Sequence, residues 1–507
     1  MKKKSILVSS ITLMVFMAVS KGLGFFREMV LAFYYGAGAI TDAYVTATTI
    51  SIAVFSGIPG SIVAAYILVV GERDKTSEEG NRFTSNILNC FALFILSLSI
   101  LSIVFIRSIV RLFAVGLDAR TMAMTVTMAS VMLMFSVFFT VSNVMGAYLQ
   151  YNRVFWYVGV SNILTNIVVI VAIAFSNQNI YVLAFGYGFS ILAASLFTFL
   201  LARAKRYRYR VVVQLKDTGL KKVVTLSIPI FLGFLLYELN IIVDRNFSSV
   251  LGEGVISAVN YASKINLLFH TLIVGSIITV LFPTLSDLCR KSDFQAFKQV
   301  AHKAYGAVVF IMIPISLWLL SFSLPLIELV FMRGAFDQRA GVMTSQILRV
   351  YSIGLPFMGI NQILIHQFYS LLETKTPIKC SMISLSINVI LNFCFIRPLG
   401  YVGIALATSI SAMILMVLLF IRLRKRVQDL QIGSLAINSG LVLLSSLGML
   451  AVIYIMNNAF SSMIGGGFLL LSLSSFAGGI AYLLLTMIFR LPVRLNFIKA
   501  KNIDKDQ

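Results

Sequence analysis

The chain has 507 residues, of which 59% are hydrophobic and only 12% are charged, with a mean hydropathy of +0.94. A typical soluble domain carries about 25% charged residues, so this composition excludes a water-soluble protein. Apolar stretches of roughly 20 residues or more recur from end to end, each long enough to cross the bilayer. No polar segment is long enough for an attached catalytic or nucleotide-binding domain, so we expect the activity to lie within the membrane.

Apolar runs between polar segments predict an all-α polytopic membrane protein with about fourteen transmembrane helices. The predicted helices span residues 5–35, 40–70, 83–106, 122–150, 154–176, 179–202, 223–251, 255–288, 304–332, 341–372, 380–396, 402–421, 435–459 and 464–489. The first of them resembles a secretory signal peptide, but its apolar character continues to Tyr35, which is too far for such a signal. We therefore expect it to be retained as a membrane helix.

The net charge of +22 comes from 41 Lys and Arg against 19 Asp and Glu. In a soluble protein such an excess would indicate a nucleic acid partner, but in a membrane protein it marks the cytoplasmic loops. With the N-terminus inside, the outside connections hold only Arg107, Arg111, Arg120, Arg333, Arg339 and Arg397. The charge therefore predicts an inner-membrane topology with both termini in the cytoplasm, and no nucleic acid partner.

Sequence motifs for cofactor chemistry are absent. There is no GxxxxGK[ST] loop for a nucleotide, the three histidines lack metal-ligand spacing, and the four cysteines form no CxxC pair. We therefore expect no enzymatic activity and no bound organic cofactor.

The two halves of the chain repeat one another in order. Gly36-Ala37-Gly38 and Tyr44 recur as Gly252-Glu253-Gly254 and Tyr261, Asn162 and Asn166 recur as Asn388 and Asn392, and Tyr181-Val182 recurs as Tyr401-Val402. This predicts a six-helix half in residues 1–203, a basic cytoplasmic linker in 204–222, a second six-helix half in 223–423, and two extra helices with a basic tail in 424–507. Each half starts on the inside, so the repeats are parallel, and a substrate site is expected where they meet.

Several short motifs follow one another in a recognisable order. They are Ser20-Lys21-Gly22-Leu23-Gly24-Phe25-Phe26-Arg27-Glu28, Thr41-Asp42-Ala43-Tyr44, Asn260-Tyr261-Ala262-Ser263-Lys264, Leu281-Phe282-Pro283-Thr284-Leu285-Ser286, Arg333-Gly334-Ala335-Phe336-Asp337 and Lys375-Thr376-Pro377. In this order they resemble the MurJ/MviN family of lipid II flippases, in the multidrug/oligosaccharidyl-lipid/polysaccharide exporter superfamily. The resemblance implies transport of the peptidoglycan precursor lipid II to the outer leaflet by alternating access, for cell-wall synthesis. It also implies contacts with membrane lipids and with the cell-wall synthesis machinery.

Five cations fall inside predicted spans, where each ionised side chain costs about 2.5 to 3.5 kcal/mol. They are Lys21, Arg27, Arg245, Lys264 and Arg349. Adjacent residues on a helix do not face one another, which argues against a pair between Arg27 and Glu28 and leaves a cross-helix pair of Arg27 with Asp42 open. The two interpretations are purely structural ion pairing and a cationic chamber between the halves that receives a pyrophosphate head group.

The family resemblance favours the chamber, because Lys21, Arg27 and Lys264 occupy positions where the family has essential basic residues, often arginine. Asp42 is predicted to belong to the same substrate site. Lysine at two of these positions departs from the family and lacks the bidentate fork of arginine. Arg349 is a candidate substrate or gating residue, although a cation near a helix end can also extend to the membrane surface.

The second predicted helix departs further from the family, because residues 50–70 carry no charge where relatives have an arginine and a glutamate-glycine pair. Instead, Gly57, Pro59 and Gly60 are expected to interrupt the helix. The two interpretations of this motif are a gating hinge and close helix packing through small residues.

Acidic, amide and hydroxyl side chains form a second constellation of candidate residues, namely Asp244, Asn388, Asn392 and Thr408. Asn388 and Asn392 share one helix face at i, i+4, and hard oxygen ligands from several helices suit a small cation. Interhelical hydrogen bonding is the alternative. Some members of the family bind sodium at corresponding positions, so the resemblance implies a sodium site here.

Three rival functions remain open. The nearest is export of another polyprenyl-pyrophosphate-linked oligosaccharide, such as an exopolysaccharide or teichoic-type precursor. A multidrug antiporter would need acidic walls for cationic drugs, and a membrane scaffold would have no use for costly intramembrane cations.

Overall fold

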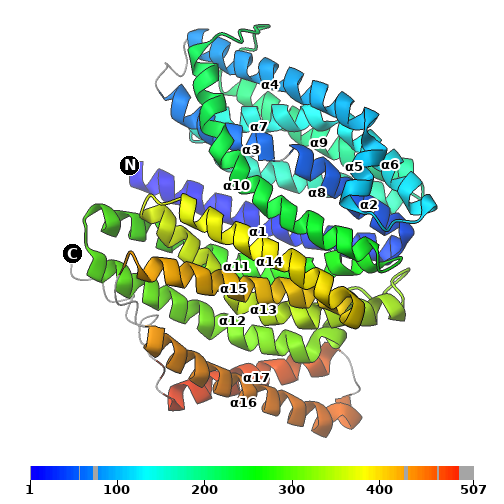
Figure 1. Ribbon diagram of the computed structural model, residues 1–507, viewed down its shortest axis with the longest axis vertical. Coiled ribbons are helices and arrows are strands. Elements are labelled where there is room, and N and C mark those ends of the chain that lie inside the picture. The colour runs from blue at the N-terminus through cyan, green and yellow to red at the C-terminus, as the bar shows by residue number, and fades with distance from the viewer. Residues whose placement is uncertain are drawn as a thin grey trace. The chain divides into compact units, whose positions relative to one another are not determined.

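The computed structural model describes residues 2–55, 57–71, 78–427, 432–464, 468–489 and 491. These residues form helices joined by turns, without a β-strand in the described ranges (Figure 1). The helices are α1 (Lys2–Tyr35), α2 (Ala39–Phe55), α3 (Gly57–Val70), α4 (Glu78–Val104), α5 (Ile106–Phe113), α6 (Ala119–Met134), α7 (Ser136–Tyr151), α8 (Tyr157–Phe175), α9 (Ile180–Ala204), α10 (Thr218–Ser249), α11 (Val255–Arg290), α12 (Phe294–Val330), α13 (Gln338–Ser370), α14 (Lys375–Leu399), α15 (Tyr401–Arg424), α16 (Ile432–Ile464) and α17 (Phe468–Ile488).

Each predicted membrane span coincides with a helix or a pair of consecutive helices. In the described part of the chain, ten helices are long and apolar enough to cross a membrane, and α6 with α7, bent by 42°, would form an eleventh span. The other predicted spans correspond to α1, to α2 followed by α3, and to α10. The prediction of an all-helical polytopic membrane protein is confirmed.

The chain divides into two compact units. The first comprises Met1–Ser257 and Arg333–Ala340, and the second comprises Ala258–Met332 and Gly341–Gln507. The boundary between the units is crossed three times along the chain. The first crossing lies inside α11 after Ser257, and the other two lie at the ends of the segment Arg333–Ala340, the last of them inside α13. The boundaries predicted from the internal repeat stay a prediction, because the two units reflect packing rather than sequence similarity.

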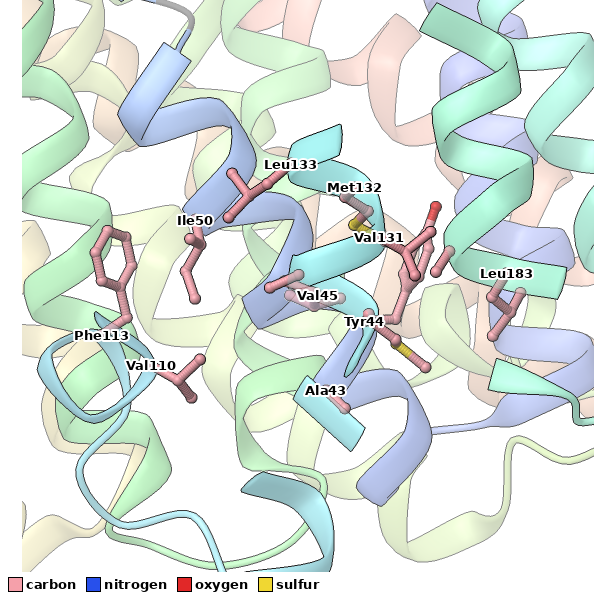
Figure 2. Close-up of a cluster of buried hydrophobic side chains, with 14 of the residues drawn as sticks. Ala43, Tyr44, Val45, Ile50, Val110, Phe113, Val131, Met132, Leu133 and Leu183 are labelled. Carbon is pink, nitrogen blue, oxygen red and sulfur yellow. The ribbon is translucent and has the colours of Figure 1, made fainter. Parts of the chain in front are cut away.

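The core of the first unit holds α2 in place. Figure 2 shows Tyr44, Val45 and Ile50 of α2 beside side chains of α5, α6 and α9, all of them in one buried cluster. Ala43 and Ala47 are fully buried in the same cluster, so the helix backbones approach closely. This packing fixes the position of the first turn of α2, which carries Asp42.

Small residues let α1 and α8 approach in the same unit. A Cβ added at Gly159 of α8 would lie 2.3 Å from the Cβ of Phe16 in α1, and one at Gly24 of α1 would lie 3.7 Å from Asn166 in α8. Gly159 therefore marks the tight point of this helix pair, while the contact at Gly24 is an ordinary van der Waals distance. Close packing of this kind replaces the hydrophobic driving force that helices lack inside lipid.

The glycines of α3 face α10. A Cβ at Gly57 would lie 3.1 Å from the ring of Phe231, and one at Gly60 would lie 3.6 Å from the ring of Phe234. These contacts support close helix packing. The predicted interruption at Gly57, Pro59 and Gly60 falls in the first turn of α3. Ser56, between α2 and α3, and the side chain of Pro59 lie outside the described residues, so the hinge stays a prediction.

In the second unit, helix α12 is kinked. Phe322 has non-helical dihedral angles of φ −115° and ψ 21°, three residues before Pro325. Proline removes one backbone hydrogen bond and its ring crowds the preceding turn, which accounts for the kink. Further along the unit, Trp318 donates from Nε1 to Ser475 at 2.9 Å, and Tyr482 donates to the carbonyl of Phe310 at 2.6 Å, so α17 is bonded to α12.

We expect Gly159→Ala to lower the melting temperature of the purified protein, because the added methyl group overlaps Phe16. Overpacking of this kind typically costs about 1 to 3 kcal/mol. Gly275→Ala is the matched control, since nothing lies within 4 Å of a Cβ there. The control should be neutral or stabilising, because alanine favours a helix by about 1 kcal/mol over glycine. Equal shifts for the two variants would contradict the tight packing of α1 on α8.

Candidate functional site

Arg27 of α1 has two partners in the first unit. Its Nη2 lies 2.7 Å from Oε1 of Glu28, and its Nη1 donates to Oδ1 of Asn166 in α8 at 3.2 Å. The expectation that neighbours on a helix cannot pair is wrong here, because the long arginine side chain bends back to the next carboxylate. The Glu28 side chain is only 7% exposed, so the carboxylate is compensated by the arginine in a buried setting.

Asn166 in turn is tied to both helices. Its Nδ2 donates to the carbonyl of Asn162 at 2.9 Å and to the carbonyl of Ser20 in α1 at 3.4 Å. The amide therefore fixes the guanidinium of Arg27 relative to α8. Lys21 is half-buried, and its side chain has no hydrogen bond or ion pair to the described residues. It lies about 120° around the helix from Arg27, given 100° per residue.

Asp42 serves as a cap for the beginning of α11. Its Oδ2 accepts from the backbone N–H of Gly254 at 2.6 Å, its Oδ1 accepts from the N–H of Ser257 at 2.8 Å, and the Ser257 hydroxyl donates to it as well. In return, Oε1 of Glu253 accepts from the N–H of Ala39 at 2.9 Å, at the start of α2. Asp42, after the first glycine loop, thus accepts from the beginning of α11. Glu253, in the second glycine loop, accepts from the beginning of α2.

A third loop joins these two. The N–H of Ala335 donates to the carbonyl of Phe33 at 2.8 Å, beside the end of α1. A Cβ at Gly36 would lie 2.4 Å from the carbonyl oxygen of Ala335, and one at Gly334 would lie 2.3 Å from that of Phe33. Both glycines also have positive φ angles, +62° and +64°, so only glycine fits without strain. We call the residues Gly36–Asp42, Gly252–Ser257 and Arg333–Asp337 the glycine clasp.

The clasp revises one expectation. Asp42 is 2% exposed and its partners are Gly254 and Ser257, so the proposed ion pair between Arg27 and Asp42 is wrong. A role of Asp42 in substrate binding stays a prediction. Sequence reasoning named Glu28 only as a partner to be rejected, although its place next to Arg27 in an apolar helix was a usable signal.

The predicted sodium ligands of the second unit lie together. Asn392 donates from Nδ2 to Oδ1 of Asn388 at 3.1 Å, and Asn388 donates from Nδ2 to Oγ1 of Thr408 at 3.3 Å, linking α14 to α15. Both asparagines are fully buried. This geometry fits interhelical hydrogen bonding, and the same oxygens suit a hard cation. Asp244, the only carboxylate of the proposed set, is buried in α10 of the first unit, so the complete site stays a prediction.

The remaining candidate residues belong to the second unit. Lys264 is half-buried in α11. Arg349 is exposed in α13 and donates from Nε to Oγ of Ser323 at 3.3 Å, next to the kink of α12. No group of three or more His, Cys, Asp and Glu in the described ranges is placed to hold a metal ion.

We expect Asp42→Ala to destabilise the protein, because it leaves the amides of Gly254 and Ser257 buried without their acceptor. An unsatisfied buried donor costs about 1 to 3 kcal/mol. The matched control is Asp118→Ala, which removes an exposed aspartate that caps its own helix, α6, through Arg120 and Thr121. Water can replace that acceptor, so the drop in melting temperature should be smaller. An equal or larger drop for Asp118→Ala would show that the clasp contributes little to stability.

Comparison with known proteins identifies the fold and the family. Residues 31–475 match the family model described as lipid II flippase MurJ. A protein named lipid II flippase MurJ from Burkholderia cenocepacia is 25% identical over 427 residues, covering 81% of this chain and 82% of the relative. A probable lipid II flippase MurJ from Buchnera aphidicola is 27% identical over 430 residues, covering 83% of each chain.

Solved structures agree with this assignment. One titled "Lipid II flippase MurJ, inward closed conformation" superposes with a TM-score of 0.82 at 26% identity, over 94% of this chain and 98% of the other. An inward-facing multidrug transporter of the MATE family shares the fold at 16% identity and a TM-score of 0.71, over 83% of this chain and 99% of the other. The family match spans most of the sequence, and the chain belongs to the lipid II flippase MurJ family.

Proposed function

We propose that this protein moves lipid II from the inner to the outer leaflet of the bacterial cytoplasmic membrane by alternating access. The family match over residues 31–475 carries the proposal. The buried cation of α1 supports it, since an anionic lipid head group needs a positive partner inside the membrane. The chain is a transporter without covalent chemistry. The distribution of Lys and Arg supports a cytoplasmic position for both termini.

In this proposal Arg27 is the principal contact for the pyrophosphate. Its guanidinium is positioned by Asn166 and is neutralised by Glu28 before substrate arrives. An arriving pyrophosphate would take over hydrogen bonds that Glu28 now receives, so the cation need not be left unpaired at any stage. Lys21 and Lys264 add positive charge as compact ammonium groups with less geometric demand than arginine.

We further propose that the glycine clasp closes the transport path at the outer face. With the N-terminus inside, the loops 36–38 and 252–254 both lie outside the membrane. The clasp is held by hydrogen bonds from backbone amides to the carboxylates of Asp42 and Glu253, each with a net contribution of about 1.5 to 3 kcal/mol. Opening of the path in this proposal requires these bonds to break.

Export of another polyprenyl-pyrophosphate-linked oligosaccharide is the second candidate. It is favoured by one observation, the absence of charged side chains between residues 50 and 70. The two functions share the pyrophosphate contacts and differ in the sugar that is recognised.

The function is tested in a bacterium depleted of its own lipid II flippase. Expression of the wild-type chain should restore growth and remove the accumulated lipid II, measured by mass spectrometry of extracted lipids. Lys21→Ala, Arg27→Ala and Lys264→Ala should each fail at normal membrane levels, because each removes a cation from the proposed chamber. Lys21→Arg and Lys264→Arg should retain function.

Arg107→Ala and Arg111→Ala are the matched controls, since both cations are exposed and neither side chain has a hydrogen bond or an ion pair with the described residues. They should complement fully. Accumulation of a different lipid-linked sugar, together with failure of the wild type to clear lipid II, would assign the second candidate function. Complementation by Arg27→Ala would refute the cationic chamber.

Sodium should raise the melting temperature of the purified protein more than potassium at equal ionic strength, if Asp244, Asn388, Asn392 and Thr408 form one site. A ligand at a hundred times its Kd stabilises the folded state by about 2.7 kcal/mol. Asp244→Asn should abolish the difference, because it removes the carboxylate. Identical melting curves in both salts would leave the asparagines as hydrogen-bonding groups only and leave the cationic chamber untouched.

A further inference from the structure

An apolar groove lies within the first unit, next to the first turns of α3. It is enclosed by α3, α4, the beginning of α10 and the last residues of the loop before α10, and its volume is about 380 Å³. The lining is almost entirely apolar and includes Ile62, Phe91, Phe94, Leu215, Val224 and Ile228. We call it the linker groove. Its size falls in the range of ligand-binding pockets in proteins.

The wall formed by the loop is rigidly built. Residues 205–216, here called the linker strap, begin and end in turns, and residues 207–214 between the turns run along α4 (Figure 1). Side chains of α4 bond to this segment in place of a neighbouring β-strand. The polar stripe of α4 consists of Asn81, Ser85, Asn86 and Asn89. Oδ1 of Asn86 accepts from the N–H of Gln214 at 2.6 Å, and its Nδ2 donates to the carbonyl of Gln214 at 3.1 Å.

The other bonds repeat this pattern along the strap. Asn81 accepts from the N–H of Arg208, Ser85 accepts from the N–H of Arg210, and Asn89 donates to the carbonyls of Arg210 and Val212. The bonded backbone groups belong to even-numbered residues, as expected for one edge of an extended chain. The strap is therefore a fixed part of the first unit.

One face of the strap presents apolar side chains. Tyr209, Val211, Val213 and Leu215 alternate with the bonded residues and are 46%, 86%, 49% and 70% exposed. Alternating residues of an extended chain point to opposite sides. A row of exposed apolar side chains next to transmembrane helices is suited to the lipid interface rather than to water.

Cations are frequent in the segment that supplies Leu215, Leu220 and Val224 to the groove. Between residues 203 and 222 the chain has eight Lys and Arg and a single acidic residue, Asp217. Lys216 follows the groove residue Leu215, and Lys221 shares a helix face with Val224 and Ile228 at i, i+3 and i+7. Both lysines are exposed, and neither side chain has a hydrogen bond or an ion pair with the described residues.

We propose that the linker groove is a binding site for an anionic phospholipid of the adjacent leaflet, with one acyl chain in the groove and the phosphate at Lys216 and Lys221. Charge complementarity selects the head group, since each Lys or Arg near an anionic lipid surface contributes about tenfold or less to binding. The apolar lining of the groove favours the acyl chain of the lipid.

The occupant is a resident lipid rather than the transported substrate. The groove is formed by one unit alone, and its walls are held by the contacts of α3 with α10 and by the bonds of the linker strap to α4. A transported head group instead needs a path where the two repeats meet. The acyl chain of the bound lipid would fill the space between α3, α4 and α10.

The test is native mass spectrometry of the full-length protein, purified in detergent and offered equal amounts of phosphatidylglycerol and phosphatidylcholine with identical acyl chains. The wild type should retain phosphatidylglycerol preferentially. Lys216→Gln with Lys221→Gln should reduce the preference by on the order of tenfold. Val224→Trp should reduce retention of both lipids, because the indole fills the groove.

Each variant has a matched control on the same unit. Arg107→Gln with Arg111→Gln removes two exposed cations elsewhere, and Val104→Trp places an indole at a position that is 70% exposed and outside the groove. Both should bind as the wild type does. A preference that survives Lys216→Gln with Lys221→Gln, or equal retention of the two lipids by the wild type, would overturn the proposal. Displacement of phosphatidylglycerol by an equal concentration of undecaprenyl phosphate would also overturn it and would assign the groove to the substrate's own tail.

Discussion

A buried carboxylate that satisfies the first backbone amides of a helix is the interaction on which the arrangement of the first unit depends. Helix termini leave N–H groups without partners, and where those groups are buried within the protein, water is not available to replace them. Asp42 accepts from the amides of Gly254 and Ser257 and so fixes the start of α11 against α2. The core cluster around Tyr44 and Ile50 holds α2 in the position from which Asp42 reaches these amides (Figure 2). The glycines of the clasp allow the loops to approach one another.

The same constraint explains the other polar features of the described residues. Arg27 is neutralised by Glu28 and oriented by Asn166, so its charge is held in a defined place within the helices. The asparagines of α14 bond to one another and to α15. At the edge of the membrane, the amides of α4 satisfy the backbone of an extended segment that has no β-strand beside it. These polar groups thus have a structural function as well as any role in transport.

Much of the fold could be predicted from the sequence, because long apolar segments in a membrane leave the chain few alternatives to helices. The positions of Lys21, Arg27, Asn388 and Asn392 within helices followed from the same pattern. The partners of these residues could not be predicted. The pair of Arg27 with Glu28 depends on how a flexible side chain bends. The acceptor role of Asp42 depends on contacts among three loops that are far apart in the sequence. Helical periodicity describes one helix at a time and contains no information on such contacts.

The clasp also shows how far the two repeats have diverged in chemistry. At the repeat offset of the glycine loops, the counterpart of Asp42 falls at Ala258 or Val259, and the counterpart of Glu253 is Ala37. Neither counterpart has a side chain that can accept a hydrogen bond, so each carboxylate is present in one repeat only. A symmetric dimer requires every contact to occur twice, with residue i meeting residue j and j meeting i. Two copies of one half could repeat only the contact of that half's own carboxylate, so the clasp as it stands combines carboxylates from two unlike halves.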